Sequence, residues 1–205
     1  MNIHFRQAQP SDTRIAVPLI YSAGPHEFEY VYGMPGKTVC DFLEYAFPSG
    51  RGLLSYPVHE VATIDEQVVG IGAFYGGNEY LRLGKENIGV MFRYYGLVNF
   101  MKLMVRIIKI DTILTSPEKN AFHIEQLAVK EANRGSGVGT ALLQYEISRA
   151  REKRFAKCTL DVAITNPQAQ KLYERLGFKV VKEYPWKYPT SRVEVPAERR
   201  MELIL

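Results

Sequence analysis

The run Asn133-Arg134-Gly135-Ser136-Gly137-Val138-Gly139-Thr140 stands between an apolar, strand-like segment and a long helical pattern. Three of its five residues from Gly135 to Gly139 are glycine, so the backbone is nearly bare and can point its N–H groups at a ligand. The helix expected over residues 138–154 adds unpaired N–H groups and the positive end of its dipole. This combination predicts an anion site and, with it, a phosphate-bearing cofactor.

The spacing of the glycines narrows the choice of ligand. A Walker loop would end in Gly-Lys-Ser/Thr, whereas this run ends in Gly139-Thr140 without a lysine. A dinucleotide loop would read G-x-G-x-x-G, whereas this one reads G-x-G-x-G. Asp161 lies about 20 residues further on, where a dinucleotide fold has an acid, but it falls inside an apolar strand pattern. A dinucleotide-binding oxidoreductase and a turn that only packs tightly are the weaker alternatives.

The strand before the loop breaks its own alternation. Phe122 and Ile124 are two residues apart, and so are Leu127 and Val129, but Ile124 and Leu127 are three apart. Because side chains alternate between the two faces of a strand, one extra residue must be absorbed, as a β-bulge does. A bulge would splay the strand from its neighbour and free backbone groups for an extended ligand; the alternative is a frayed strand without a role.

The composition is typical of a soluble globular protein with one core. The chain has 205 residues, of which 46% are hydrophobic and 23% charged, and a net charge of +4. The basic residues form no run, so we expect no nucleic-acid partner. Cys40 and Cys158 make neither a disulfide framework nor a metal site. With no segment apolar enough to span a membrane, we expect a cytoplasmic protein. We also expect no metal, because neither His26 nor His59 has the spacing of a metal ligand.

The periodicity predicts a single mixed α/β domain over residues 1–205. Strands are predicted over residues 2–8, 59–64, 68–74, 122–129, 158–164, 178–182 and 198–205. Helices are predicted over residues 12–23, 38–47, 88–110, 138–154 and 168–176. Strands first, then alternating helices and strands, indicate a three-layer domain.

A second motif, Asn166-Pro167-Gln168-Ala169-Gln170-Lys171-Leu172-Tyr173-Glu174-Arg175-Leu176-Gly177-Phe178, follows the glycine run. Asn166 suits an N-cap, Pro167 a first helical position and Gly177 a C-cap. The apolar face of this helix includes Tyr173, whose hydroxyl needs a partner. Together with Arg134-Gly135-Ser136-Gly137-Val138-Gly139 and the preceding Ile124-Glu125-Gln126-Leu127-Ala128-Val129, this motif resembles the GNAT superfamily of N-acetyltransferases over about residues 121–183.

The resemblance implies a central, mostly antiparallel sheet of six to seven strands flanked by helices, with a V-shaped split between the fourth and fifth strands. Acetyl-CoA, the implied co-substrate, would lie in that split. Backbone groups of Leu127 and Val129 would pair with its pantetheine arm, the N–H groups from Arg134 to Thr140 would hold its pyrophosphate, and Asn166 would reach the arm. The full implied cofactor set is Leu127, Ala128, Val129, Arg134, Gly135, Ser136, Gly137, Val138, Gly139, Thr140, Asn166, Ala169 and Tyr173.

The implied reaction is attack of a primary amine on a thioester. A lysine-like amine has a pKa of about 10.4 and arrives protonated, so a base is needed, and the departing thiolate needs an acid. Tyr173 matches the family position of the general acid, or else only packs. Base candidates are Glu125, for which we expect a pKa raised by its apolar neighbours, then Asp161 and His123; a water chain is the alternative. An acyl-CoA-binding sensor that lost catalysis is the competing function.

The acceptor, a small molecule or a peptide amine, is less well marked. Glu27 and Glu29 lie among aromatic residues such as Tyr30 and would suit a cationic amine; a helix end with solvated charges is the alternative. The segment over residues 78–120 departs from the family pattern, which joins these strands by a short turn. Its amphipathic stretch over residues 88–110 is interpreted as extra core or a homodimer contact, as a lid over the acceptor pocket, or as a surface for acidic partners.

Overall fold

A computed structural model describes residues 2–188 and 193–205 of the chain. Its centre is one seven-stranded sheet with the order β1-β2-β3-β4-β5-β7-β6. The parallel pair is β4–β5, and all other neighbours are antiparallel. The strands are β1 His4–Gln7, β2 His59–Ile64, β3 Gln67–Gly76, β4 Ala121–Val129, β5 Lys157–Ala163, β6 Lys179–Tyr184 and β7 Glu198–Ile204.

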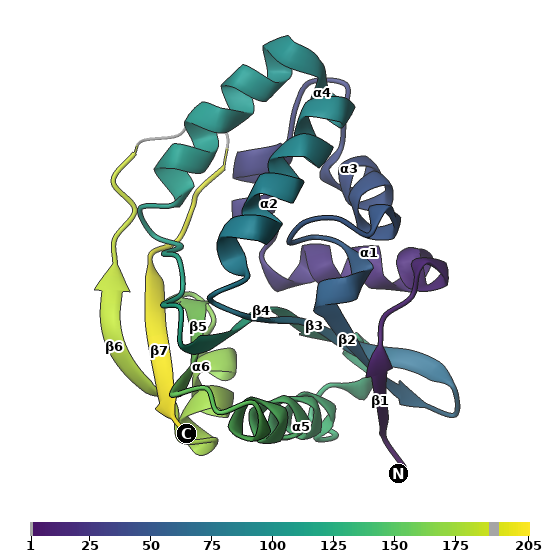
Figure 1. Ribbon diagram of the computed structural model, residues 1–205, viewed down its shortest axis with the longest axis vertical. Helices are drawn as coiled ribbons and strands as arrows, with labels where there is room; N and C mark the ends of the chain where they lie inside the picture. Colours follow the sequence, from purple (N-terminus) through teal and green to yellow (C-terminus); the bar gives the residue numbers. More distant parts are fainter. Residues whose placement is uncertain (1, 189–192) are drawn as a thin grey trace.

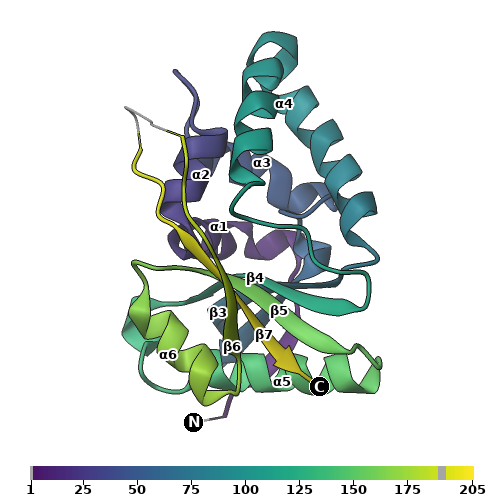
Figure 2. The ribbon, with the colours of Figure 1, turned by 90° about the vertical axis from the view of Figure 1, so that its left-hand side faces the viewer.

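Helices cover both faces of this sheet, in three layers (Figure 1). One face carries α1 Thr13–Ala23, α2 Pro25–Tyr32, α3 Val39–Ala46 and α4 Tyr80–Ile110, and the other carries α5 Val138–Glu152 and α6 Pro167–Arg175. The short 3-10 turns are η1 Pro10–Asp12, η2 Phe47–Ser49, η3 Tyr56–Val58 and η4 Glu131–Asn133. Figure 2 shows α5 and α6 beneath the sheet and the other helices above it. The predicted fold class is therefore confirmed.

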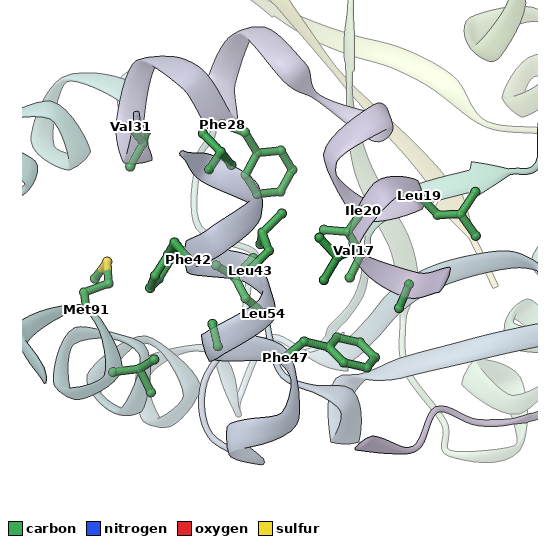
Figure 3. Close-up of a cluster of buried hydrophobic side chains, with 14 of the residues drawn as sticks. Val17, Leu19, Ile20, Phe28, Val31, Phe42, Leu43, Phe47, Leu54 and Met91 are labelled. Carbon is green, nitrogen blue, oxygen red and sulfur yellow. The ribbon is translucent and has the colours of Figure 1, made fainter. Parts of the chain in front are cut away.

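Each face of the sheet has its own buried apolar core. On the side of α1 to α4, side chains from all four helices meet Val61 and Ile71 of the sheet, and Figure 3 shows Phe42 and Leu43 of α3 between the other helices. On the opposite side, Leu142 and Leu143 of α5 pack with Leu160 of β5 and with α6. The burial of these apolar side chains is the main force that holds both helical layers to the sheet.

Helix α2 is the element that the sequence did not predict. It begins at Pro25, directly after Gly24, and ends before Gly33. The mixture of aromatic and charged residues between two glycines hides its helical period, although Phe28 and Val31, three residues apart, form its buried side. This helix proves important because it forms one wall of the cavity described below.

Helix α4 is longer than predicted and is not one straight helix. It starts at Tyr80, and Gly96, with φ 69° and ψ 168°, divides it into two helical parts. The expected single apolar face is wrong beyond this kink, since the side chains of Leu97, Val98, Met101, Val105 and Ile108 are exposed. The inner side of the second part instead includes the buried Leu103 and Ile110. Within the described residues, no helix is both long enough and apolar enough to cross a membrane.

Candidate active site

The predicted bulge is present in β4. Ala73 pairs with Glu125 and Ile71 pairs with Ala128, so three residue steps on β4 oppose two on β3. The extra residue is accommodated at Gln126, whose φ is +55°. His59 Nε2 lies 2.8 Å from the Gln126 Oε1, and His59 Nδ1 lies 2.8 Å from the Ser55 carbonyl oxygen. The buried imidazole thus fixes the bulge, and burial lowers its pKa.

The bulge coincides with a split in the sheet. The β4–β5 ladder runs from Ala121–Lys157 to Ile124–Leu160. Among the described residues it pairs no further, although β4 continues to Val129 and β5 to Ala163. The backbone of β4 from the bulge onward is therefore free of strand partners on its β5 side. This is the V-shaped split that was predicted between the fourth and fifth strands.

The glycine run lies beside this split at the start of α5. Gly135 and Gly137 have φ values of +77° and +89°, and Gly137 is the N-cap of the helix. A Cβ atom built on either residue meets no atom within 4 Å, so the conformation, rather than crowding, requires glycine there. The first N–H groups of α5 have no partner inside the helix. Open space over bare N–H groups at a helix N-terminus fits a pyrophosphate.

Helix α6 places Tyr173 at the same split. Asn166 caps the helix by accepting a hydrogen bond from the Ala169 N–H at 3.1 Å, and Pro167 follows it. Gly177, with φ +95°, ends the helix, and the N–H of Phe178 donates to the Tyr173 carbonyl oxygen. Burial, with the nearby charge of Glu198, raises the pKa of Tyr173 to about 12. The phenol therefore carries its proton at neutral pH.

A cavity of about 500 Å³ adjoins the split, with α2 and α4 contributing to its walls. Its volume falls in the range of small-molecule sites. The cavity brings together seven of the predicted site residues: Glu27, Glu125, Leu127, Asp161, Asn166, Ala169 and Tyr173. Both parts of α4 line it, through residues such as Met91 and Ile107. Helix α4 also places Met91 and Leu103 in the main core, so its position agrees with the interpretation as extra core, while the lid stays a prediction.

Other predicted site residues lie outside this cavity. The glycine run, Ala128 and Val129 are not among its lining residues. Neither are Glu29 and Tyr30: the Glu29 carboxylate accepts a hydrogen bond from the Tyr21 hydroxyl at 3.0 Å, and the Tyr30 ring packs edge-on against Trp186. Of the three predicted acceptor residues, the structure therefore places only Glu27 in the cavity.

Glu125 follows Ile124, the last residue of β4 that pairs with β5. Its Oε1 lies 3.3 Å from His123 Nε2, and His123 Nδ1 lies 2.8 Å from the Thr159 hydroxyl. Burial acts to raise the pKa of Glu125, but His123, Tyr75 and Arg200 favour the charged form and leave the pKa below its ordinary value. The expected rise in pKa is therefore wrong, because the buried polar neighbours outweigh the apolar ones.

Asp161 is paired with Arg200 rather than with His123. Its two carboxylate oxygens accept hydrogen bonds from Arg200 Nε and Nη2 at 2.7 and 2.9 Å, and both side chains are less than 10% exposed. Arg200 also donates to the carbonyl oxygen and hydroxyl of Thr115. Burial raises the pKa of Asp161, while Arg200 opposes that rise. The pair fastens the segment after α4 to β5 and β7.

Glu198 is the site residue that the sequence did not reveal. It is the first residue of β7, is buried, and lines the cavity together with Glu27. Burial, followed by the charges of Glu27 and Asp161, raises the pKa of Glu198 to about 9. Burial also raises the pKa of Glu27. The only local signal was an acid ahead of a strand, which is ordinary on a protein surface.

The four acids at this site do not form a metal centre. Among residues 2–188 and 193–205 no group of three or more His, Cys, Asp and Glu side chains is placed to hold a metal ion. What the site does contain is a proton-bearing phenol, an ionised carboxylate backed by a histidine, and the carboxyl groups of Glu27 and Glu198 in the same cavity.

Comparisons with known proteins point to one family. The chain is 43% identical over 61 residues to an N-alpha-acetyltransferase of Sulfurisphaera tokodaii, a match that spans 29% of this chain and 36% of that relative. An N-acetyltransferase from Staphylococcus aureus Mu50 superposes with a TM-score of 0.71 at 22% identity, covering 98% of this chain and all of the other. An agmatine N-acetyltransferase gives 0.59 at 17% identity over the whole of both chains.

The two structural likenesses concern the fold alone. The family model described as the acetyltransferase (GNAT) family matches residues 26–178, which include the split, the glycine run and α6. This match covers more than half of the chain. The protein therefore belongs to the acetyltransferase (GNAT) family, and acetyl transfer in general is the activity that this membership supports.

Proposed function

We propose that the protein is an acetyl-CoA-dependent N-acetyltransferase that acetylates a primary amine by direct attack in a ternary complex. This proposal rests on how three features are arranged around the split between β4 and β5. The strand split at the bulge and the proton-bearing Tyr173 adjoin one cavity lined by carboxylates, and the bare N-terminus of α5 follows the unpaired end of β4 along the chain.

The residues present fit acetyl-CoA, which supplies the acetyl group as a thioester. The unpaired side of β4 at Leu127 and Val129 would pair with the amides of the extended arm, as an added strand does. The N–H groups from Gly135 to Thr140 would receive the pyrophosphate. Asn166 and Ala169 line the cavity at the start of α6, where the arm would pass.

In this proposal, side chains around the cavity donate and accept the protons of the reaction. The amine nitrogen forms the C–N bond while the C–S bond breaks, and Tyr173 supplies the proton that the departing thiolate needs. Glu125, ionised and backed by His123, is the proposed base for the proton that leaves the amine. Asp161 is the weaker choice, because both of its oxygens already accept from Arg200. We assign it to positioning Arg200 instead.

We further propose that residues 1–205 form one domain in which the segment 78–120 is a helical insertion between β3 and β4. Both helical layers cover the same seven-stranded sheet, and α4 returns the chain to its centre. A cytoplasmic location and an acceptor that is a small molecule or a peptide amine complete the proposal. The names of the relatives include both kinds of acceptor, an N-alpha amine and agmatine.

Calorimetric titration with acetyl-CoA, with NADH as the control, tests the cofactor. Binding of acetyl-CoA alone, followed by release of free thiol in the presence of amines, is the expected result. Binding of NADH alone would instead favour an oxidoreductase, and no binding of either would contradict the assignment of the glycine run. Binding without turnover of any amine would favour the sensor function.

A further inference from the structure

The outer side of helix α4 carries a run of exposed apolar side chains. They lie in the last turn before the kink at Gly96 and along the part of the helix that follows it. Their exposed fractions range from 46% to 70%, and they are Phe92, Leu97, Val98, Met101, Val105 and Ile108. We call these six residues the α4 patch. Single exposed apolar residues are ordinary on a protein surface, but a run of them along one helix marks a site of contact.

The α4 patch is separate from the cavity between α2 and α4. None of its six residues is among those that line the cavity. The second part of α4 is held from its inner side by the buried Leu103 and by Arg106, whose Nη1 donates to the Gly33 carbonyl oxygen at 2.7 Å. The rings of Phe92 and Phe100 meet across the kink with their centroids 5.3 Å apart. The fold thus keeps the patch on the outer surface.

The charges of α4 are almost all positive. The helix contains six basic residues and one acidic residue, whereas the whole chain has a net charge of only +4. Glu86, the single acid, is ion-paired with Arg82. From residue 87 to residue 110 the sequence has no Asp or Glu. Within this stretch the exposed Arg93 and Lys102 flank the kink. The surface around the patch therefore favours a partner with negative charge.

The exposed acids of α3 lie on another side of α4. Asp41 and Glu44 belong to α3, which contacts α4 through the ring of Tyr94. Tyr94 follows Phe92 by two residues, so the two side chains point about 160° apart around a helix of 3.6 residues per turn. The acids of α3 are therefore on the side of α4 that faces away from Phe92.

A surface pocket beside the patch gathers three basic side chains. Its lining residues are Arg51, Lys85, Glu86, Gly89 and Arg93. Gly89 leaves the helix backbone bare there, since a Cβ atom built on it meets no atom within 4 Å. Arg93 directly follows Phe92 of the patch. Three cations and one acid, already paired with Arg82, give the pocket a net positive charge that suits a phosphate group.

This surface lies at an extremity of the molecule. The two parts of α4 meet at the top of Figure 1, at the end of the helical layer farthest from the sheet, and Figure 2 shows the same arrangement. Apolar side chains at an outer end, with cations on both sides of the kink, match an anionic bilayer, whose acyl chains are bordered by phosphates. A second copy of this chain would match the apolar side chains but would bring its own Arg93 and Lys102 to the contact.

We propose that the α4 patch docks on the surface of an anionic lipid bilayer, with the side chains around Gly96 among the acyl chains and the lipid phosphates at Arg93 and Lys102. This proposal goes beyond the acetyltransferase function and does not depend on it. A second copy of the chain is the competing occupant of the patch.

The first experiment is sedimentation of the protein with lipid vesicles. Vesicles of equal parts phosphatidylglycerol and phosphatidylcholine are expected to bind it, and vesicles of phosphatidylcholine alone are not. Binding should weaken as the ionic strength rises from its physiological value to about 1 M, because the Debye length shortens from about 8 to about 3 Å. No binding to the mixed vesicles, or equal binding to both kinds, would overturn the proposal.

The second experiment compares two exposed valines. Val98 of the patch is 70% exposed, and Val181 of β6 is 53% exposed. Val98→Gln is expected to weaken binding to the mixed vesicles about tenfold through lost apolar burial, and Val181→Gln to leave it unchanged. Unchanged midpoints of urea denaturation show that both variants are folded. Equal losses in the two variants would contradict insertion of the patch.

The third experiment tests the charges with Arg93→Gln. Removing one positive charge near an anionic surface is expected to weaken vesicle binding about fivefold. Arg151→Gln, at an exposed position of α5 on the other face of the sheet, is the matched control and should have no effect. If inorganic phosphate at constant ionic strength displaced the protein from vesicles while Val98→Gln bound them like the parent chain, the pocket would take a free anion and the proposal would fail.

Sedimentation equilibrium without lipid tests the second copy. The parent chain and Val98→Gln are expected to show the same mass, because the patch is open to solvent when no bilayer is present. A dimer that Val98→Gln dissociates and Val181→Gln leaves intact would assign the patch to a second copy of the chain and overturn the proposal.

Discussion

The proposed cofactor region and the proposed acceptor region of this molecule present different chemical groups. The cofactor region, from β4 to α6, offers backbone: an unpaired strand side, bare glycines and the N-terminus of α5. The proposed acceptor region, between α2, α4 and β7, offers side chains: the carboxyl groups of Glu27 and Glu198 and a lining of apolar and polar residues. A backbone site needs only a local conformation, whereas a side-chain site needs distant segments in register.

The difference has a practical meaning for mutation. Side-chain substitutions at the backbone site matter mainly where they alter φ and ψ, so glycines are the sensitive positions. At the acceptor site the side chain is the contact, so an isosteric exchange such as Glu to Gln is informative. Tyr173 lines the cavity on α6, and we propose that it acts where the two regions meet.

Removing the Tyr173 hydroxyl has the largest expected effect. Tyr173→Phe deletes the proposed acid without changing the packing of the ring, so kcat should fall roughly 10²- to 10⁴-fold. The dissociation constant for acetyl-CoA should stay within about threefold, because the backbone site is intact. Thiol release and calorimetry measure the two quantities. Full activity would show that the ring only packs, which is the alternative left open by the sequence.

The next largest effect is expected at the Asp161–Arg200 ion pair, which joins the segment after α4 to β5 and β7. Asp161→Asn leaves Arg200 buried without its anion, and breaking such a pair costs about 3–5 kcal/mol of unfolding free energy. Urea denaturation measures this loss. Adding Arg200→Met to the same chain should restore part of the stability. A stable Asp161→Asn variant that had lost turnover would instead restore Asp161 as a catalytic candidate.

The backbone site itself is tested at Gly137. A β-branched residue at φ +89° is strained by about 1–3 kcal/mol, and relief of that strain would move the N–H groups at the start of α5. Gly137→Val should therefore weaken acetyl-CoA binding about 10- to 100-fold while leaving KM for the amine unchanged. Gly89→Ala, in open space on α4, is the matched control and should stabilise by up to about 1 kcal/mol. Equal effects on both ligands would argue against two separable regions.

The smallest expected effect is a slope of stability with pH. Because the pKa of Glu198 is about 9 in the folded chain against an ordinary 4.5, the folded state binds more protons than the unfolded state between these pH values. Below pH 4.5 Glu198 is protonated in both states and costs no stability. As pH rises from 4.5 to about 9, the free energy of unfolding falls, because the unfolded chain can ionise Glu198 and the folded chain cannot. Glu146, whose pKa burial raises to about 7, acts in the same direction.

Glu198→Gln should flatten this slope and be more stable than the parent chain towards the upper end of the window. Urea denaturation at about pH 5 and about pH 8 measures both chains. Parallel slopes in the two chains would mean that Glu198 is not held protonated by the fold.

The same contrast explains what could be predicted from the sequence. The bulge follows from the three-residue spacing of Ile124 and Leu127, and the cap of α6 from Asn166-Pro167, since both are local signals. Glu198 could not be predicted as a site residue, because its place depends on β7 pairing between β5 and β6. Glu27 was predicted for its charge, but its place with Glu198 in one cavity was not. The kink at Gly96 was missed, since a single glycine is compatible with a helix.

The position of α4 bears on how such a protein can diversify. This helix enters after β3 and leaves before β4, so it contributes cavity residues without taking part in the strand ladder that defines the split. The proposed acceptor walls and the proposed cofactor backbone therefore lie on different segments of the chain. Under the proposed function, substitutions on the cavity side of α4 would change the choice of acceptor while the backbone of β4 and the start of α5 stay the same.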